Sequence, residues 1–424
     1  MRETARRQCI AYGNVGHRML KKPAVLVAAG VILRLAFVGL AGAHNLTFHS
    51  GGSDAPAYVL IASNLLHGRG FSYNAPTAFR PPLYPLILAT AMGIFHNGWI
   101  LAIRLLQFGA GILGCLLCAW AAEDVFGPRG KWTALIAGLF LPTLIFATAQ
   151  ALTESLAAFF TSLFLYCLVR KQPWGMGASA GLASLIRFNS LPLALVGAWH
   201  LRQKPLRAVI PLLLTFLFIA PWLVRNDVTF GHIVYSTQTG INAVQGVVAP
   251  QGRTQAGSEE KIAKALGPLD MHPTDAPDPS MFGTVSAAVP ETLANERVLR
   301  IVPGLWRTEG WHAVPLLLRK VGYFWLSTDQ ILHTQGLLWK ERLIRVAGVV
   351  AYWLVLAAAI VGWWRLRETH PTLALTLLLY VAGFTLMHLP FVMNTRLRIP
   401  LMDPLLCMLA GGSIKSNSDG GFSL

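Results

Sequence analysis

Charged residues are scarce in this chain. Only 13% of its 424 residues are Asp, Glu, Lys or Arg, whereas 54% are hydrophobic and the mean hydropathy is +0.52. Soluble domains carry roughly 25% charged residues. Acidic residues are the rarer kind, with 19 Asp and Glu against 35 Lys and Arg. This composition excludes an ordinary soluble globular domain.

Several catalytic and metal-binding signatures are also missing. The sequence holds no Walker, HExxH or GxSxG pattern, and His67 and His96 have no partner at metal-ligand spacing. Of the five cysteines, Cys115 and Cys118 form a CxxC, but it lies in a leucine-rich stretch with no second pair. Packing is the favoured role of that pair. We find no internal repeat.

Long apolar stretches are abundant instead. Seven of them approach the roughly 20 residues that cross a bilayer as a helix. They are residues 23–43, 100–122, 131–149, 152–169, 207–224, 343–364 and 371–391. A hairpin of two short helices over 175–200, with Arg187 at its bend, and a last helix over 399–413 complete the set. We therefore predict an all-α polytopic membrane protein with a bundle of about ten transmembrane helices.

Loop charges predict the orientation of this bundle. Residues 1–22 hold six bases and one acid, which places the amino terminus in the cytoplasm by the positive-inside rule. Segment 226–310 holds nine acids and six bases, a net charge of −3, and is predicted outside. The short basic loops are predicted inside: Arg129/Lys131, Arg170/Lys171, Arg202/Lys204/Arg207 and Arg365/Arg367. The excess of basic residues thus reflects topology and not nucleic-acid binding, with both termini cytoplasmic and the bacterial inner membrane the expected location.

The same reasoning divides the chain. We predict a cytoplasmic tail over 1–22, a transmembrane module over 23–225 with its first outer loop at 44–99, and a loop-rich outer domain over 226–328. Transmembrane helices over 329–415 and a disordered tail over 416–424 follow.

Two shorter apolar segments are predicted to lie at the outer surface. Residues 83–96 are interpreted as a re-entrant or juxtamembrane helix, since 14 residues reach only about 21 Å and a crossing would invert every later loop. Residues 311–328 are predicted to form an amphipathic helix whose apolar stripe contains Val314, Leu317, Val321 and Phe324.

Unusual polar residues gather on the predicted outer side. The candidates are Asp54, Arg80, Glu154, Arg225, Arg396 and Arg398, with Arg187 reaching the same side from its hairpin. Arginine binds phosphate through a planar fork of donors, and a nearby carboxylate can accept a proton from a hydroxyl. A lipid phosphate is the natural ligand at a membrane surface.

Each candidate also has a structural interpretation. Asp54 can be a solvated loop acid, and Glu154 can stabilise a helix amino terminus. Arg225, Arg396 and Arg398 can anchor lipid headgroups. Arg34, in the middle of the first apolar stretch, must pair or extend to the interface, and we favour a structural role for it.

The order of these motifs resembles that of a known superfamily. The Asp54…Tyr58 box is followed by Arg80-Pro-Pro-Leu-Tyr-Pro85, Leu152-Thr-Glu-Ser155, Gly181-Leu-Ala-Ser-Leu-Ile-Arg187, Pro221-Trp-Leu-Val-Arg-Asn226 and Arg396-Leu-Arg-Ile-Pro400. Over residues 30 to 410 the chain resembles GT-C glycosyltransferases. The nearest group is similar to bacterial relatives of protein O-mannosyltransferases and of the lipid A aminoarabinose transferase, enzymes of the cell envelope.

The resemblance implies an extracytoplasmic site that transfers a sugar from a polyprenyl-phosphate donor with inversion. Asp54 matches the general base, and Arg80 falls where a basic residue lies near the donor phosphate. Glu154 matches a second acidic position, which in some members helps to bind a divalent cation such as Mg or Mn.

The remaining site residues also follow from the resemblance. Arg225 and Arg396 or Arg398 would neutralise the departing phosphate, and Tyr58 and Arg187 complete the expected substrate-binding set. Many members have two adjacent acids where this chain has Ser53-Asp54-Ala55, which weakens the case for a metal held by Asp54 and Glu154. The segment 236–246 departs from the usual Gly-Asn box.

Other functions remain open at this point. A transporter or flippase of lipid-linked saccharides would place ionisable residues near the bilayer midplane and often has repeated halves. Arg34 favours that alternative, whereas the other charges gather at one edge. A structural partner in an envelope complex is a further alternative. The expected acceptor is a glycan, a lipid or a protein.

Overall fold

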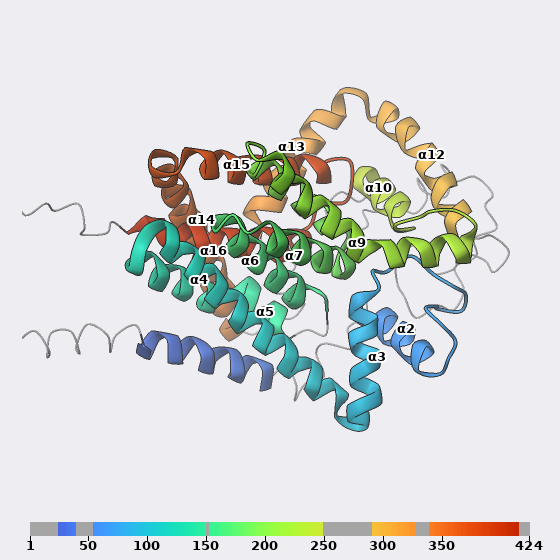
Figure 1. Ribbon diagram of the computed structural model, residues 1–424, viewed down its shortest axis with the longest axis horizontal. Coiled ribbons are helices and arrows are strands. Elements are labelled where there is room, and N and C mark those ends of the chain that lie inside the picture. Colours follow the sequence, from blue (N-terminus) through green and yellow to red (C-terminus); the bar gives the residue numbers. More distant parts are fainter. Residues whose placement is uncertain (1–23, 40–53, 150–151, 249–290, 328–338, 415–424) are drawn as a thin grey trace, which may run out of the picture.

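The protein is all-helical, as predicted. The computed structural model describes residues 24–39, 54–149, 152–248, 291–327 and 339–414, and these contain helices but no strand. The predicted tails 1–22 and 416–424 lie outside the described residues, and so does the part 249–290 of the predicted outer domain. Figure 1 shows the helices gathered into one bundle, with α2, α3, α10 and α12 at one side.

A helical hairpin begins the bundle. Helix α4, Trp99–Phe140, contains a reversal at Gly127 (φ 78°, ψ −173°), followed by Pro128. A side-chain carbon added at Gly138 would lie 3.0 Å from the sulfur of Cys115. In one continuous helix these two positions would be about 35 Å apart. The two halves are therefore antiparallel, which confirms separate helices over 100–122 and 131–149. Cys115 and Cys118 are both buried, and Cys115 packs against the second half at Gly138.

The second half of the hairpin is broken, which the sequence did not predict. Leu141 is extended (φ −67°, ψ 115°), and α5, Pro142–Ala149, follows. Pro142 has no N–H to donate to the carbonyl of Gly138. Arg34, fully buried in the N-terminal helix Ala24–Gly39, donates to that carbonyl and, at 3.2 Å, to Leu139. Its predicted structural role is confirmed, because it satisfies backbone groups that water cannot reach.

The next helices run between the two ends of the bundle. They are α6, Glu154–Val169; α7, Pro173–Ile186; α8, Leu193–His200; and α9, Pro205–Phe230. Helices α7 and α8 are joined through η2, Phe188–Ser190, so Arg187 lies at the predicted bend. We call the end at which α6 begins the site end, and the end at which it reaches Lys171 the basic end.

Helix α16, Thr395–Ala410, is the centre of the bundle. Every residue from Arg398 to Ala410 is buried, and α16 packs against α4, α6 and α14. Its surroundings are completed by α14, Trp339–Thr369; α15, Pro371–His388; and η5, Gly411–Ser413. The helix begins four residues before its predicted start at 399, because Asn394 accepts a hydrogen bond from Leu397 N and acts as the N-cap.

The predicted first outer loop contains two helices that pack on each other. They are α2, Ala55–Leu66, and α3, Leu83–Phe95. The chain then turns sharply at His96 (φ 43°, ψ −113°) and continues through η1, His96–Gly98, into α4 (Figure 1). With 13 residues α3 is about 20 Å long, too short for the hydrocarbon core.

The segment 226–310 is more helical than the predicted loop-rich domain. Helix α9 extends to Phe230, and α10, Thr239–Val248, and α12, Glu291–Glu309, also fall in this segment. Val244 and Val298 bring α10 and α12 together in a small apolar cluster. The amphipathic pattern of each helix was too short, within a polar segment, to stand out in the sequence.

The predicted amphipathic helix exists, and a lysine outside the predicted stripe is buried together with part of it. After η3, Gly310–His312, helix α13 spans Ala313–Leu326. Val314 is 51% exposed, whereas Lys320 and Phe324 are buried. The ammonium of Lys320 donates to the carbonyl oxygens of Gly246, at 3.0 Å, and Leu389. A lysine thus takes the inward position because it satisfies two backbone oxygens.

Four stretches of the described residues are long and apolar enough to cross a membrane. They are Leu83–Phe140, which the breaks at His96 and Gly127 divide into shorter helices, Pro205–Phe230, Val346–Thr369 and Pro371–His388. This is an integral membrane protein. The total of about ten crossings stays a prediction, because helices such as Ala24–Gly39 and Glu154–Val169 have fewer than 18 residues.

The contact between α14 and α16 provides a test of this packing. A side-chain carbon at Gly362 would collide with the carbonyl oxygen of Leu409, whereas one at Gly383 would meet nothing within 4 Å. Gly362→Ala is expected to destabilise the protein by about 1–3 kcal/mol through overpacking. The matched Gly383→Ala is expected to be neutral or stabilising by about 0.5–1 kcal/mol. Thermal unfolding in detergent measures both, and equal effects would contradict this packing.

Candidate functional site

Five charged side chains meet at the site end, and each comes from a different element. Asp54 immediately precedes α2, and Arg80 lies just before α3. Glu154 is the first residue of α6, Arg187 is the C-cap of α7, and Arg396 is in the first turn of α16. We call these five residues the charged cluster.

The charged cluster is a continuous chain of ion pairs. Asp54 contacts Arg80 through Oδ1 at 2.9 Å and Arg396 through Oδ2 at 3.0 Å. Arg396 also reaches Glu154 Oε1 at 2.9 Å, and Arg187 lies 3.2 Å from the same oxygen. Arg396 therefore joins the two carboxylates, and each carboxylate has one further arginine.

Local structure explains why these side chains face one another. The Asn394 cap starts α16 early enough to place Arg396 on the helix, where its direction is fixed. Glu154 occupies the first turn of α6, where a negative charge is stabilised by the helix dipole. Arg187 is held by a hydrogen bond from Nη1 to the hydroxyl of Thr153, at 2.8 Å. Secondary-structure ends, and not flexible loops alone, thus position the cluster.

The guanidinium of Arg80 packs against two aromatic rings. The guanidinium carbon lies 5.3 Å from the centre of the Tyr58 ring and 5.0 Å from that of Phe79. Tyr58 packs edge to face on Tyr84, with the ring centres 5.2 Å apart. Tyr58 therefore joins the cluster as a cation–π partner of Arg80.

The cluster carries a surplus of positive charge. Three arginines face two carboxylates, so the net charge is +1 when all are ionised. Burial disfavours the charged form of the Asp54 carboxyl. The charges of Arg80 and then Arg396 outweigh burial and hold the pKa of Asp54 well below its ordinary value. Asp54 is consequently ionised throughout the physiological pH range.

The outer edge of the cluster is formed by one acid and one base. The side chains of Asp54 and Arg396 are 30% and 28% exposed. Arg80 and Glu154, at 5% and 3%, lie behind them. A molecule that approaches from solvent or from the membrane surface therefore meets Asp54 and Arg396 first.

A lone amide in an apolar helix, Gln107, fixes the start of α6. Gln107 Nε2 donates to Leu152 O at 2.6 Å and lies 3.4 Å from the Tyr84 hydroxyl. Ser155 donates in turn to the carbonyl of Gln107. The sequence analysis missed this residue, although an unaccompanied glutamine within 100–122 was a readable signal.

One carboxylate oxygen of Glu154, Oε2, accepts no hydrogen bond from the described residues. Oε1 receives the arginines, whereas Oε2 is buried and no group in the described part of the chain donates to it. A buried acceptor without a donor is costly. It is therefore a natural place for a donor group supplied by a ligand.

Two of the predicted site arginines lie outside the cluster. Arg225 donates to the carbonyls of Thr77 and Phe71, at 2.8 and 2.7 Å, and so fastens the loop that carries Arg80 to α9. Arg398 is fully buried and pairs with Asp403 at 3.1 Å. Each of these arginines makes at least two hydrogen bonds to other parts of the protein. The structure does not bring either of them to Asp54.

Glu291 is a second residue that the sequence analysis missed. As the first residue of α12 it accepts hydrogen bonds from the backbone N–H of Ala78 and from the hydroxyl of Thr237. Burial raises the pKa of its carboxyl despite these bonds. No sequence pattern signals this contact, because more than two hundred residues separate Ala78 from Glu291.

Arg396 occupies the position between Asp54 and Glu154 at which a shared divalent cation would bind. Its guanidinium lies within ion-pair distance of both carboxylates. The described residues contain no group of three His, Cys, Asp or Glu side chains that could hold a metal ion.

Comparison with known proteins gives a distant structural likeness. No protein-family model matches the chain, and no curated protein matches it. The crystal structure of ArnT from Cupriavidus metallidurans bound to undecaprenyl phosphate is similar to it, with a TM-score of 0.41 and 17% identity over 92% of this chain and 77% of that one. For ArnT in the apo state the TM-score is 0.37 and the identity 17%, over 91% and 77%. A likeness at this level does not define the function.

The placement of Arg398 can be tested by stability. Arg398→Leu leaves Asp403 buried without its partner and is expected to cost about 3–5 kcal/mol, whereas removing both charges is often close to neutral. The double change Arg398→Leu/Asp403→Leu should therefore recover much of the loss. Unfolding in detergent measures both variants. A single variant as stable as the wild type would show that the pair is not structural.

Proposed function

We propose that the protein is an inverting glycosyltransferase that moves a sugar from a polyprenyl-phosphate donor to an acceptor hydroxyl at the extracytoplasmic face of the membrane. The observation that supports this most is the charged cluster: an ionised, partly exposed Asp54 held between Arg80 and Arg396 at the edge of a membrane bundle. These are the groups that a phosphate leaving group and a proton acceptor require. The sequence resemblance to GT-C glycosyltransferases points to the same chemistry.

The donor phosphate is proposed to bind at the arginines. The surplus positive charge of the cluster is unbalanced until an anion arrives, and guanidinium forks match phosphate oxygens. Arg396 is the accessible one and Arg80 lies behind it. A phosphate placed there lies next to Asp54, which brings the reacting groups together.

Donor binding would also change the proton affinity of Asp54. In the structure its two arginine contacts keep it ionised but make it a weak base. A phosphate shares the charge of Arg80 and Arg396, and this sharing raises the pKa of Asp54 toward the range in which a general base is efficient. The base would thus be activated only when the donor is present.

The proposed reaction balances as a single displacement. The acceptor oxygen forms a bond to the anomeric carbon from the face opposite the phosphate while Asp54 takes the hydroxyl proton. The bond between the anomeric carbon and the phosphate oxygen breaks, and the electron pair leaves with the polyprenyl phosphate. The arginines stabilise the charge that develops on that phosphate.

Glu154 is proposed to position groups and not to transfer protons. Its Oε1 holds Arg396 and Arg187, so its loss would release both arginines. The buried Oε2, which lacks a donor among the described residues, would accept a hydrogen bond from a sugar hydroxyl.

The transporter alternative has lost its main support. Arg34, the residue that favoured this alternative, donates its hydrogen bonds to the carbonyls at the break in the hairpin. The charged cluster, by contrast, lies at one end of the bundle, where a reaction at the membrane face needs it.

Replacement of the proposed base is the direct test. Asp54→Asn keeps the shape of the side chain and removes the proton acceptor, so transfer should fall by roughly 10²–10⁴-fold. Asp227→Asn, an exposed acid near the end of α9 on the same side, is the matched control and should retain full activity. The assay is release of polyprenyl phosphate from synthetic polyprenyl-phosphate pentoses and hexoses by purified protein.

Two results would contradict the proposal. Near wild-type release by Asp54→Asn would refute the base assignment. Binding of these donors by the wild type without release from any of them, in the presence of candidate glycan, lipid and peptide acceptors, would favour a carrier.

Metal removal gives an independent prediction. Because Arg396 lies where a cation would sit, transfer is expected to persist when EDTA replaces Mg²⁺ and Mn²⁺ in the assay. Activity within about twofold of the untreated protein is expected, since charge stabilisation would come from arginines. Abolition by EDTA and restoration by added Mg²⁺ would overturn this prediction.

A further inference from the structure

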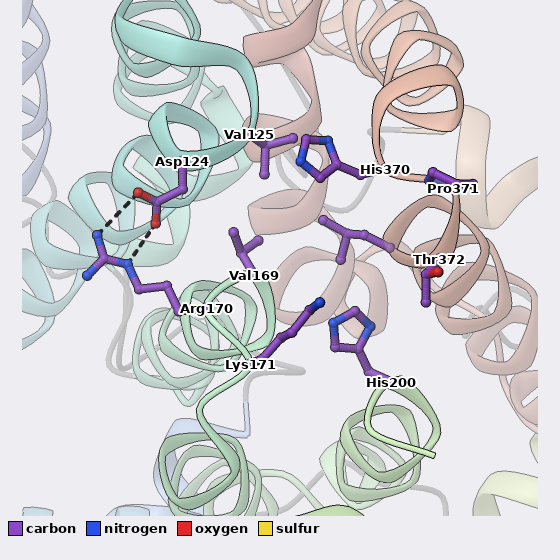
Figure 2. Close-up of a pocket in the computed structure, with 10 residues that line it drawn as sticks. Asp124, Val125, Val169, Arg170, Lys171, His200, His370, Pro371 and Thr372 are labelled. Carbon is purple, nitrogen blue, oxygen red and sulfur yellow. Dashed lines mark hydrogen bonds and ion pairs between the residues drawn. The ribbon is translucent and has the colours of Figure 1, made fainter. Parts of the chain in front are cut away.

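A polar cavity lies at the basic end, away from the charged cluster. It has a volume of about 380 Å³ and is bordered by the first half of α4, the α6–α7 connection, the end of α8 and the start of α15. Figure 2 shows side chains from these elements pointing into a common space. Helix α6 runs from Glu154 at the site end to this cavity, a length of about 24 Å.

The cavity has an excess of positive charge. Its single acid, Asp124, is already paired with Arg170, at 2.7 and 3.3 Å (Figure 2). Lys171 is the remaining charged group of the lining, and within the described part of the chain no acid lies at ion-pair distance from it. The cavity thus carries one positive charge that no acid of the lining balances.

A helix amino terminus adds to this field. Helix α15 has 18 residues, and its first residues, Pro371, Thr372 and Leu373, line the cavity. The first N–H groups of a helix have no intrahelical acceptor and carry the positive end of the helix dipole. Such an end binds phosphate and other anions readily.

Lys171 adopts a backbone conformation that normally belongs to glycine. Its φ is +53°, and it occupies the position just past the end of α6. The bonds from Lys171 N to Leu168 O, at 3.1 Å, and from Gln172 N to Cys167 O, at 2.9 Å, complete a Schellman motif. Glycine would adopt this conformation at lower cost, so the lysine side chain stands here at the expense of some stability.

A buried histidine provides the second observation. His200 is only 7% exposed, and its Nδ1 lies 3.1 Å from the hydroxyl of Thr376. No group among the described residues hydrogen-bonds to its Nε2. The imidazole borders the same space as Lys171 (Figure 2). The Thr376 hydroxyl donates to Thr372 O at 2.8 Å, so His200 Nδ1 donates to Thr376 and Nε2 is the acceptor nitrogen. A hydroxyl of a ligand, such as a protonated phosphate oxygen, would satisfy it.

We propose that this cavity is a phosphate-binding site, in which Lys171, the amino terminus of α15 and His200 hold a phosphate group. The charge of Lys171 attracts the anion, and the free N–H groups at the start of α15 donate hydrogen bonds to its oxygens. His200 Nε2 accepts a hydrogen bond from a protonated oxygen of the phosphate. The group is either a free phosphate or the phosphate of a lipid headgroup at this membrane face. The proposal is independent of the transferase reaction.

The test compares variants whose folds are not at risk. Lys171→Gly removes the charge and suits the positive φ, so its unfolding temperature should equal or exceed that of the wild type. Lys204→Gln removes a basic residue from the neighbouring α8–α9 connection without touching the cavity and is the matched control. The full-length protein in neutral detergent is titrated with inorganic phosphate and, separately, with short-chain phosphatidic acid, at constant ionic strength. The rise in unfolding temperature reports binding.

The expected result is that Lys171→Gly weakens binding of at least one probe by about tenfold or more, while Lys204→Gln binds as the wild type does. Phosphate can also bind at the charged cluster, so the difference between wild type and Lys171→Gly is the measure of the cavity. A difference with both probes identifies a free phosphate group as sufficient, and one with phosphatidic acid alone identifies a lipid headgroup. Equal binding by wild type and Lys171→Gly, no binding by the wild type, or an equal loss in Lys204→Gln would overturn the proposal.

Discussion

The bridge that Arg396 makes between Asp54 and Glu154 is the interaction on which the site depends. Asp54 belongs to the segment before α2, Glu154 to α6 and Arg396 to α16, the buried centre of the bundle. One guanidinium thus joins an outer segment to the core. Glu154 is buried, so the loss of Arg396 would leave an uncompensated charge there. A ligand that binds Arg396 therefore changes the surroundings of both acids at once.

Much of this arrangement could be predicted from the sequence, because it follows from charge. Loop charges alone predicted that Asp54, Arg80, Glu154 and Arg396 face the same end, and the structure brings them into contact. What the sequence analysis could not separate was Arg396 from Arg398. Two residues apart on a helix, they point about 200° apart, so only one can face Asp54. Which of the two arginines faces Asp54 depends on where α16 begins. The predicted start at 399 left both arginines outside the helix. Asn394, three residues before Leu397, was the signal for the earlier start.

The other differences from the sequence-based picture have a common physical cause. Arg34, Lys320 and Arg398 all lie inside the protein, and each donates to carbonyl oxygens at places where a helix breaks or ends. Hydropathy treats such residues as costs, since it counts each side chain alone. In a bundle with little water, a buried base can instead satisfy backbone oxygens that an irregular chain leaves open. Long basic side chains are therefore components of this core, and their positions follow from breaks that no local pattern reveals.

The contacts of Arg34 also impose an order on biosynthesis. The carbonyls that receive its guanidinium lie 104 to 110 residues further along the chain. When the ribosome delivers the N-terminal helix to the membrane, none of these acceptors has been made. An unpaired arginine in a lipid-facing helix is costly, so insertion of Ala24–Gly39 alone is less favourable than its insertion beside the finished hairpin. The most favourable position of this helix therefore exists only after the hairpin of α4 and α5 has been made.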